Sequence, residues 1–318
     1  MRLLGIVLAA FCAVAFVIAA PIGVAAFSVD RNFLSVATWR SALDRTGFYS
    51  ALPDMFTATL RQEEGAAYGA LPEADVRAIA ENILPAEVAR PVIDDMISQL
   101  VAYGRAESDR IDISLTDLKQ EMETRFPQAI LQHISARPVC ARREDYGSFN
   151  CQPRPEDRAE YEARLREAAR VAWAHTPDSF TYPDGASGPN EEQRAAHVGL
   201  AKLMTVAPYA PLVLLAFVAI FAVRGTRGFL LWIGAPLMAA GAALWGLWAL
   251  GRFTAREMVD AMREDFAPTD PSMMLVPPFD LVTTEFVQQL FLWALVVSVA
   301  GFGMTVAGAM TPRTEREN

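Results

Sequence analysis

Two of the three cysteines in the chain, Cys140 and Cys151, lie within one short stretch, VCARREDYGSFNC. Nearby cysteines can form a disulfide, hold a metal ion or act as a redox pair. A structural zinc site takes four ligands, usually in close pairs, and a redox pair is normally C-x-x-C. Here ten residues separate the two cysteines, and no histidine stands at ligand spacing from them. We expect a structural disulfide, with free thiols, a metal site or a redox pair as the alternatives.

The other residues that could do chemistry are scattered. His133, His175 and His197 are far apart, and the acidic pairs at 63–64 and 94–95 are sequence neighbours that do not face each other on a helix. The sequence contains no H-E-x-x-H, G-x-S-x-G or P-loop motif. A net charge of −9 and the lack of a basic, aromatic stripe argue against nucleic-acid binding. We therefore expect a protein that is not an enzyme and uses no cofactor or metal.

Four long apolar runs without a charged side chain stand out in the rest of the sequence: 3–27, 204–223, 228–250 and 286–310. A helix rises ~1.5 Å per residue, so ~20 residues cross the hydrocarbon core of a bilayer. Each run meets that length, whereas buried helices of soluble proteins rarely lack charges over such a distance. We expect four transmembrane helices that contact the lipid bilayer. The first run exceeds the ~7–15 apolar residues of a signal peptide, which favours a retained anchor over a cleaved signal.

The orientation of the spans follows from arginines at their ends. Five arginines share one side if every run crosses once: Arg2, Arg224, Arg227, Arg313 and Arg316. Positively charged residues next to spans stay in the cytoplasm. We therefore expect a multi-pass protein of the cell membrane, plasma or inner, with both termini cytoplasmic. The acidic segments 28–203 and 251–285 then lie outside, where a disulfide persists.

The large outer segment has the pattern of a helical domain. Its apolar residues recur at helical spacing, and only Ile111–Ser114 has the pattern of a strand. The predicted fold is all-α, a four-helix transmembrane protein with a large, mainly helical extracytoplasmic domain inserted between the first and second spans. The predicted divisions are 1–27 first span, 28–203 outer domain, 204–223 second span, 228–250 third span, 251–285 outer loop, 286–310 fourth span and 311–318 cytoplasmic tail.

Small residues stand four apart in two of the spans. They are Ala239 and Ala243 in the third span, and Gly303 and Ala307 in the fourth. Such rows let helices approach closely in a membrane. We expect them to pack the spans together, with the binding of another membrane protein as the alternative.

One apolar stretch lies among prolines in the predicted outer loop: Met273, Met274, Leu275 and Val276. Apolar residues outside a membrane need a cover, and methionine surfaces adapt to different partners. We expect the stretch either to pack against the outer domain or to contact a partner protein.

Two functions fit these features. The first is a non-enzymatic binding or scaffolding component of the cell envelope, which associates with other membrane or envelope proteins or forms a homo-oligomer. The second is a permease-like subunit of a transport or mechanotransmission complex, because the order of spans is similar to that of ABC permeases that work periplasmic machinery. The inner link 224–227 is short for gripping an ATPase, which weighs against the second function. An outer-facing enzyme is the third alternative.

Overall fold

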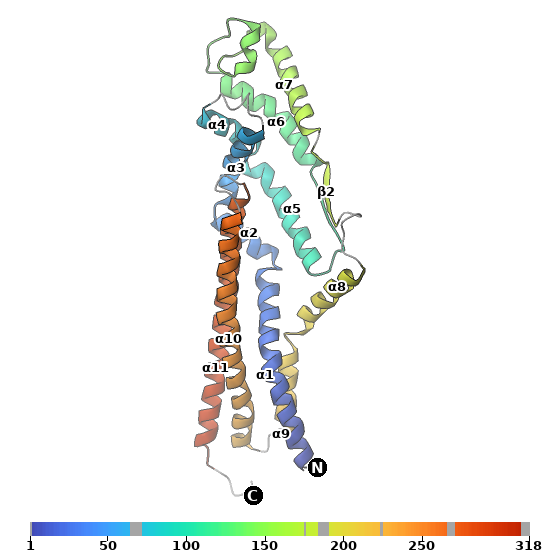
Figure 1. Cartoon of the computed structure of the whole chain (residues 1–318), viewed down its shortest axis with the longest axis vertical. Helices are drawn as coiled ribbons and strands as arrows, with labels where there is room; N and C mark the ends of the chain where they lie inside the picture. The colour runs from blue at the N-terminus through green and yellow to red at the C-terminus, as the bar shows by residue number, and fades with distance from the viewer. Residues whose placement is uncertain are drawn as a thin grey trace.

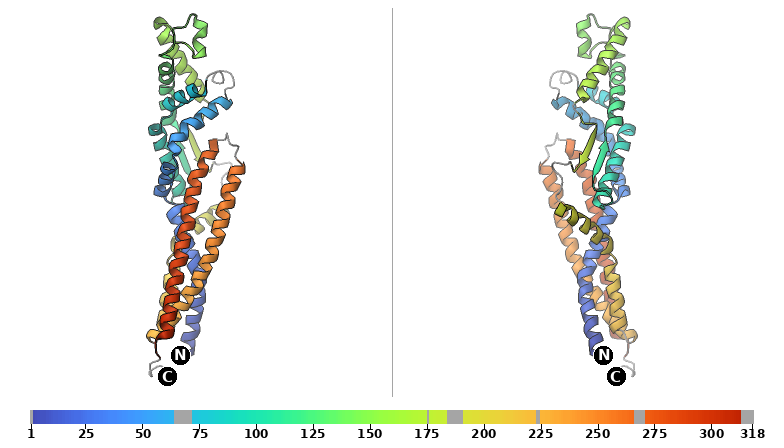
Figure 2. Two further views of the ribbon diagram at one scale, coloured as in Figure 1. Left: turned by 90° about the vertical axis from the view of Figure 1, so that its left-hand side faces the viewer. Right: turned by 90° about the vertical axis from the view of Figure 1, so that its right-hand side faces the viewer.

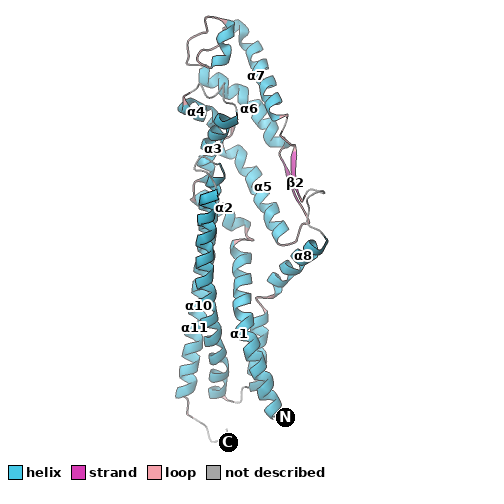
Figure 3. Ribbon diagram, viewed as in Figure 1, coloured by secondary structure: helices cyan, strands magenta, loops and turns pink. Residues whose placement is uncertain are grey.

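The protein is an elongated, almost entirely helical rod (Figure 1 and Figure 3). The computed structural model describes residues 2–63, 72–174, 176–183, 191–222, 225–265 and 271–312. The first residues of the chain that the structure describes and the last ones, near Met310, lie at one end of the rod, and the head domain, the described residues within 36–182, occupies the other end. The all-α prediction is therefore confirmed.

Among the described residues, three helices are long and apolar enough to cross a membrane, which indicates a membrane protein. They correspond to Leu4–Asn32, Thr226–Asp265 and Met273–Met310. The first lies within α1 (Arg2–Asn32), the second is α10 (Thr226–Asp265), and the third includes α11 (Val276–Met310). A fourth crossing exists only if the bent pair α8 (Glu191–Val206) and α9 (Ala210–Ala222) is one span.

The run 204–223, which we expected to form one helix, is instead broken between Val206 and Ala210 and bent by 49°. Pro208 accounts for the break, because proline cannot donate to the helix ladder and its ring clashes with the carbonyl four residues earlier. The bend packs on Gly23 of α1. A Cβ at that position would lie 2.8 Å from the carbonyl oxygen of Ala207.

The segment 251–285, which we expected to be a loop, is mostly helical. Helix α10 continues to Asp265 and α11 begins at Val276, so the two form one long hairpin that rises past the apolar runs to the head domain (Figure 2). A 3₁₀ turn, η3 (Pro271–Leu275), leads into α11.

Glycines seven residues apart hold the two helices of the hairpin together. A Cβ at Gly301 would lie 2.5 Å from the backbone nitrogen of Met238, and one at Gly241 would lie 2.9 Å from the Cα of Ser298. Gly234 and Gly308 make similarly close approaches. A seven-residue repeat keeps one face of a helix on its partner.

The rows of small residues that we expected to pack the spans together lie elsewhere. Ala239, Ala243, Gly303 and Ala307 are all exposed, and a Cβ at Gly303 would meet nothing within 4 Å. This part of the prediction was wrong. Each helix carries more than one row of small residues, and the angle at which the helices cross decides which row lies in the contact.

The head domain consists of short helices and one small sheet. Its helices are α2 (Val36–Arg45), α3 (Phe48–Glu63), α4 (Glu73–Ile83), α5 (Ala86–Gly104), α6 (Thr116–Ile134), η1 (Arg143–Ser148), η2 (Pro155–Asp157) and α7 (Arg158–Trp173). Strand β1 (Ile111–Ser114) pairs antiparallel with β2 (Ser179–Tyr182), with Ile111 opposite Tyr182. The strand pattern at 111–114 is therefore confirmed, but β2 was not predicted, because an exposed four-residue strand carries no apolar alternation.

Two apolar cores stabilise the head. The proximal core joins α2, α3 and α5 near the hairpin, and it comprises Leu43, Phe48, Tyr49, Leu52, Ala89, Ile97 and Val101. The distal core joins α4, α6, α7 and the cysteine loop, and it includes Val76, Ile79, Ile83, Ile130, Ile134, Tyr146, Phe149, Tyr161 and Leu165. Burying these side chains removes apolar area from water, the main force that folds a domain in solvent.

Candidate functional site

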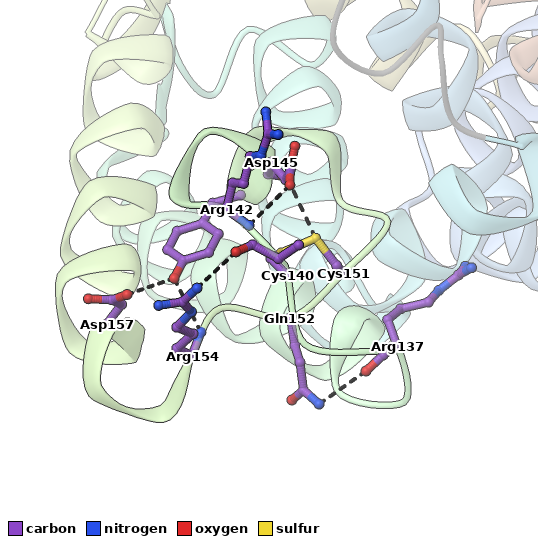
Figure 4. The surroundings of a disulfide bond; sticks show 10 residues. Arg137, Cys140, Arg142, Asp145, Cys151, Gln152, Arg154 and Asp157 are labelled. Atoms are coloured by element: carbon purple, nitrogen blue, oxygen red, sulfur yellow. Dashed lines mark hydrogen bonds between the residues drawn. A yellow bond between two sulfur atoms is a disulfide. The ribbon is translucent and has the colours of Figure 1, made fainter.

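The cysteine pair is a disulfide, as predicted. Cys140 and Cys151 are bonded, with their Cα atoms 5.0 Å apart (Figure 4). Backbone hydrogen bonds close the base of the loop, from the Cys140 nitrogen to the Gln152 oxygen at 2.9 Å and from the Gln152 nitrogen to the Pro138 oxygen at 2.9 Å. Cys12 is the free cysteine and is buried among the helices of the apolar end.

The disulfide loop is tied into the head domain by a buried carboxylate. Asp157 accepts a hydrogen bond of 2.7 Å from the Tyr146 hydroxyl and forms an ion pair with Arg143. The Tyr146 hydrogen bond, together with the charge of Arg143, lowers the pKa of the Asp157 carboxyl, while burial opposes the shift. Burial alone raises the pKa of Tyr161 beside them to about 12. These contacts make the loop a structural element of the distal core.

The two histidines that the structure describes lie in separate places. His133 lies beside Asp75, with its Nε2 atom 3.8 Å from the carboxylate, and His197 stacks on the Tyr103 ring. His175 lies outside the described residues. In the part of the chain that the structure describes, no three His, Cys, Asp or Glu side chains come close enough to hold a metal ion.

The arginines that we used to orient the spans lie largely outside the described side chains. Arg224, Arg313 and Arg316 fall outside the described residues, and Arg2 begins α1 with its side chain not described. Arg227 lies in the first turn of α10 and is partly exposed. The orientation therefore stays a prediction.

The apolar stretch 273–276 packs mainly on its own chain. Met274 contacts the proximal core, Val276 is only 3% exposed, and Met273 is half-buried. Leu275 differs, because 52% of it remains exposed. The stretch therefore covers the head domain and leaves one side chain at the edge of a cavity.

That cavity, the junction cavity, lies where the head domain meets the top of the hairpin. It has a volume of about 480 Å³, and its walls are almost entirely apolar. The head contributes α2, α3 and α5, the hairpin contributes α10, η3 and α11, and Phe33 follows the end of α1. Its lining includes Trp39, Phe48, Ile97, Leu100, Met262, Leu275 and Phe279.

Specific contacts fix the walls of the junction cavity relative to each other. The Trp39 indole donates a hydrogen bond of 2.8 Å to the Phe33 carbonyl oxygen, and the Phe33 and Phe286 rings are 5.4 Å apart. Arg45 of α2 forms an ion pair of 2.5 Å with Glu285 of α11. The cavity is thus preformed between two parts of the chain that are far apart in sequence.

A polar contact also joins α1 to α11 just below the cavity. The buried Asn32 amide donates a hydrogen bond of 2.5 Å to the Gln289 side chain and another of 2.7 Å to the Ser28 carbonyl oxygen. A buried amide without such partners is costly, so this pair fixes how α1 and the hairpin sit against each other.

A second apolar cavity lies between α1, α9, α10 and α11. Its volume is about 400 Å³, and its lining includes Phe16, Gly23, Phe27, Tyr209, Leu244 and Trp293. The Phe27 and Trp293 rings meet at 6.2 Å at its wall. This cavity lies at the depth of the apolar runs, so lipid chains can fill it.

Sequence reasoning missed the junction cavity, although one signal was present. Helix α5 carries an apolar stripe that is wider than a single neighbouring helix can cover. The stripe comprises Ile93, Met96, Ile97, Leu100 and Val101. No protein-family model matches the chain, and neither a curated protein nor a solved structure is significantly similar to it. The function is therefore inferred from the structure. The size and the apolar lining of the junction cavity suit the binding of an apolar chain.

Proposed function

We propose that the protein is a non-enzymatic binding component of the cell envelope that holds a lipid acyl chain between its head domain and its hairpin. In this proposal α8 and α9 cross the membrane as one bent span. The four spans then place both termini in the cytoplasm and the head domain outside. The observation that carries the proposal is the junction cavity, whose volume of about 480 Å³ falls within the ~300–1,000 Å³ of ligand sites.

The chemistry of the cavity supports an acyl chain as the ligand. Its lining residues include no charged side chain, so a charged ligand would lose water without gaining a partner. Leu100 and Leu275 are 47% and 52% exposed, which leaves the cavity open to a chain entering from the surface. Each methylene buried there contributes about 0.8 kcal/mol.

Photocrosslinking tests this proposal. The full-length protein in mild detergent is irradiated with a diazirine derivative of palmitic acid, and the labelled peptides are identified by mass spectrometry. We expect labels on α5 and on 273–279. Leu100→Trp, which fills the cavity, should remove them, whereas Val171→Trp, which changes an exposed residue of α7, should not. Labels confined to the apolar runs would contradict the proposal.

The proposed orientation has its own test. A cysteine at the exposed Ser135, in a Cys12→Ala background, should react with a membrane-impermeant maleimide in intact cells. Labelling only after lysis would place the head domain in the cytoplasm and would contradict the orientation.

The length of the hairpin favours a second candidate function, mechanotransmission. Helix α10 has 40 residues, about 60 Å, and runs without a break from the end that holds the termini to the head domain. A stiff pair of helices can transmit movement along that length. An ATPase that co-purifies in mild detergent and is lost on Arg227→Glu would favour this function over simple binding.

A further inference from the structure

A groove lined by charged, polar and aromatic side chains lies between α10 and α11, at the end of the apolar runs nearer the head domain. Its volume is about 390 Å³, and its lining includes Trp248, Arg252, Arg256, Thr284, Gln288 and Phe291. None of these residues lines the junction cavity, so the groove is a separate feature.

The groove carries two positively charged side chains, Arg252 and Arg256. Arg252 and Arg256 are one turn apart on α10, where like charges repel. Within the described residues, neither guanidinium has a carboxylate within ion-pair distance. Asp280 also lines the groove, but Arg263 engages it at 3.6 Å and pairs with Asp260 at 3.3 Å.

Neutral donors face the same groove. The Thr284 hydroxyl and the Gln288 amide are exposed, and neither bonds to another side chain in the described part of the protein. Hydroxyl and amide groups can donate hydrogen bonds to an anion's oxygens. An anion in the groove would therefore find charged and neutral donors together.

The position of the groove indicates where such an anion comes from. The apolar run of α10 ends at Leu250, so Arg252 and Arg256 stand about 3 and 9 Å beyond it, which is the depth of lipid headgroups. The floor of the groove is aromatic, with Trp248 and Phe291 5.7 Å apart and the Arg252 guanidinium 5.6 Å from the Trp248 ring. Tryptophan is enriched at this level of a membrane.

We propose that this groove binds the phosphate of an anionic phospholipid headgroup. Arg252 and Arg256 bind the phosphate oxygens, for which the planar, multi-donor guanidinium is well suited. Thr284 and Gln288 add neutral donors, and the glycerol end of the lipid lies over Trp248 and Phe291. A soluble phosphate ester shares the headgroup's chemistry, but it would not use the aromatic floor that faces the bilayer.

Binding measurements on the full-length protein in a neutral detergent test the proposal. Native mass spectrometry follows titrations with dioctanoyl phosphatidylglycerol, with zwitterionic dioctanoyl phosphatidylcholine and with inorganic phosphate. We expect phosphatidylglycerol to bind best. Arg252→Gln and Arg256→Gln should each weaken its binding about fivefold, and both together roughly thirtyfold. Arg164→Gln removes the same charge from an exposed position on α7 in the head domain, away from the groove, and should change the affinity less than twofold.

Three outcomes would overturn the proposal. The first is equal binding of the anionic and zwitterionic lipids. The second is an unchanged affinity in the double variant. The third is inorganic phosphate binding as tightly as the lipid, which would assign the groove to a soluble ligand. This experiment requires neither the junction cavity nor a particular orientation in the membrane, so its failure is distinguishable from that of the proposed function.

Discussion

The apolar half of the hairpin and the distal core of the head domain are held together in opposite ways. In the hairpin, glycines such as Gly301 bring two backbones into contact. In the head, large side chains such as Ile79 and Ile130 are fully buried, and the disulfide and the Arg143–Asp157 pair surround them. The difference follows from the solvent. In lipid there is no hydrophobic driving force between helices, so close packing must hold them together. In water the hydrophobic effect drives apolar side chains into a core.

The junction between the head domain and the hairpin is held by side-chain contacts of two kinds. The Phe33 and Phe279 rings pack 6.4 Å apart, while Arg45–Glu285 adds an ion pair at the surface. Because neither kind of contact fills the space completely, the junction is where a cavity remains.

The largest expected effect comes from breaking the backbone contact in the hairpin. Gly301→Leu places a side chain where a Cβ already lies 2.5 Å from the Met238 nitrogen, so α10 and α11 must separate. We expect a loss of about 3 kcal/mol or more in the free energy of unfolding, measured by thermal unfolding in detergent.

Gly303→Leu is the matched control for this change. It lies two residues away on the same helix, and a Cβ there meets nothing within 4 Å. It should leave stability unchanged or raise it slightly, because glycine is a poor helix former. Equal losses for the two variants would mean that the hairpin is not held by close glycine contacts.

The second prediction concerns the disulfide between Cys140 and Cys151, which borders the distal core. Replacing Cys140 and Cys151 with serine should lower the free energy of unfolding of the head domain by about 2–3 kcal/mol, because the open chain gains entropy when the loop is no longer closed. Denaturant unfolding with and without reductant measures it. The wild-type protein should lose the same amount on reduction, while a Cys12→Ala variant should behave as wild type. Two or more reactive thiols in the unreduced, denatured wild type would show that the bond is absent.

The third effect is a loss of stability in acid. The folded-state pKa of Asp157 is lowered below its unfolded value, so its contribution is fully present above the unfolded pKa and disappears as the pH falls through the folded pKa. We expect the head domain to lose this contribution as the pH falls from about 5, followed by circular dichroism. Asp157→Asn should be less stable at neutral pH and should flatten the curve in that window. An unchanged curve would show that the carboxylate does not stabilise the distal core.

The smallest effect concerns exposed ion pairs on α7. Arg164 pairs with Glu160 at 2.5 Å, with 71% and 53% of the side chains exposed. Arg164→Gln should change the free energy of unfolding by no more than about 0.5 kcal/mol, because water and salt screen such pairs. A loss comparable to that of the disulfide would mean that surface charge, and not the core, stabilises the head.

Features that depend on local composition were predictable from the sequence. The apolar runs that become α1, α10 and α11 show their length directly, and the spacing of Cys140 and Cys151 favoured a disulfide. Features that depend on a partner segment were not. The helices continue through 251–265 and 276–285 because they pack on each other, although these segments carry charges that resemble those of a loop.

The choice between equivalent patterns also required the structure. Gly301 and Gly303 are the same residue type on one helix, yet only the first meets a neighbour. Met274 packs on the proximal core, and the sequence alone left both packing and partner contact open.

The sequence by itself determined the helical class, the apolar runs and the covalent staple, because hydropathy, periodicity and cysteine spacing act within one segment. The tertiary structure alone decided the bend at Pro208, the glycine row of the hairpin, the junction cavity and the groove that holds Arg252 and Arg256. Each of these depends on which face of one helix meets another. That relation is fixed only when segments distant in sequence come together.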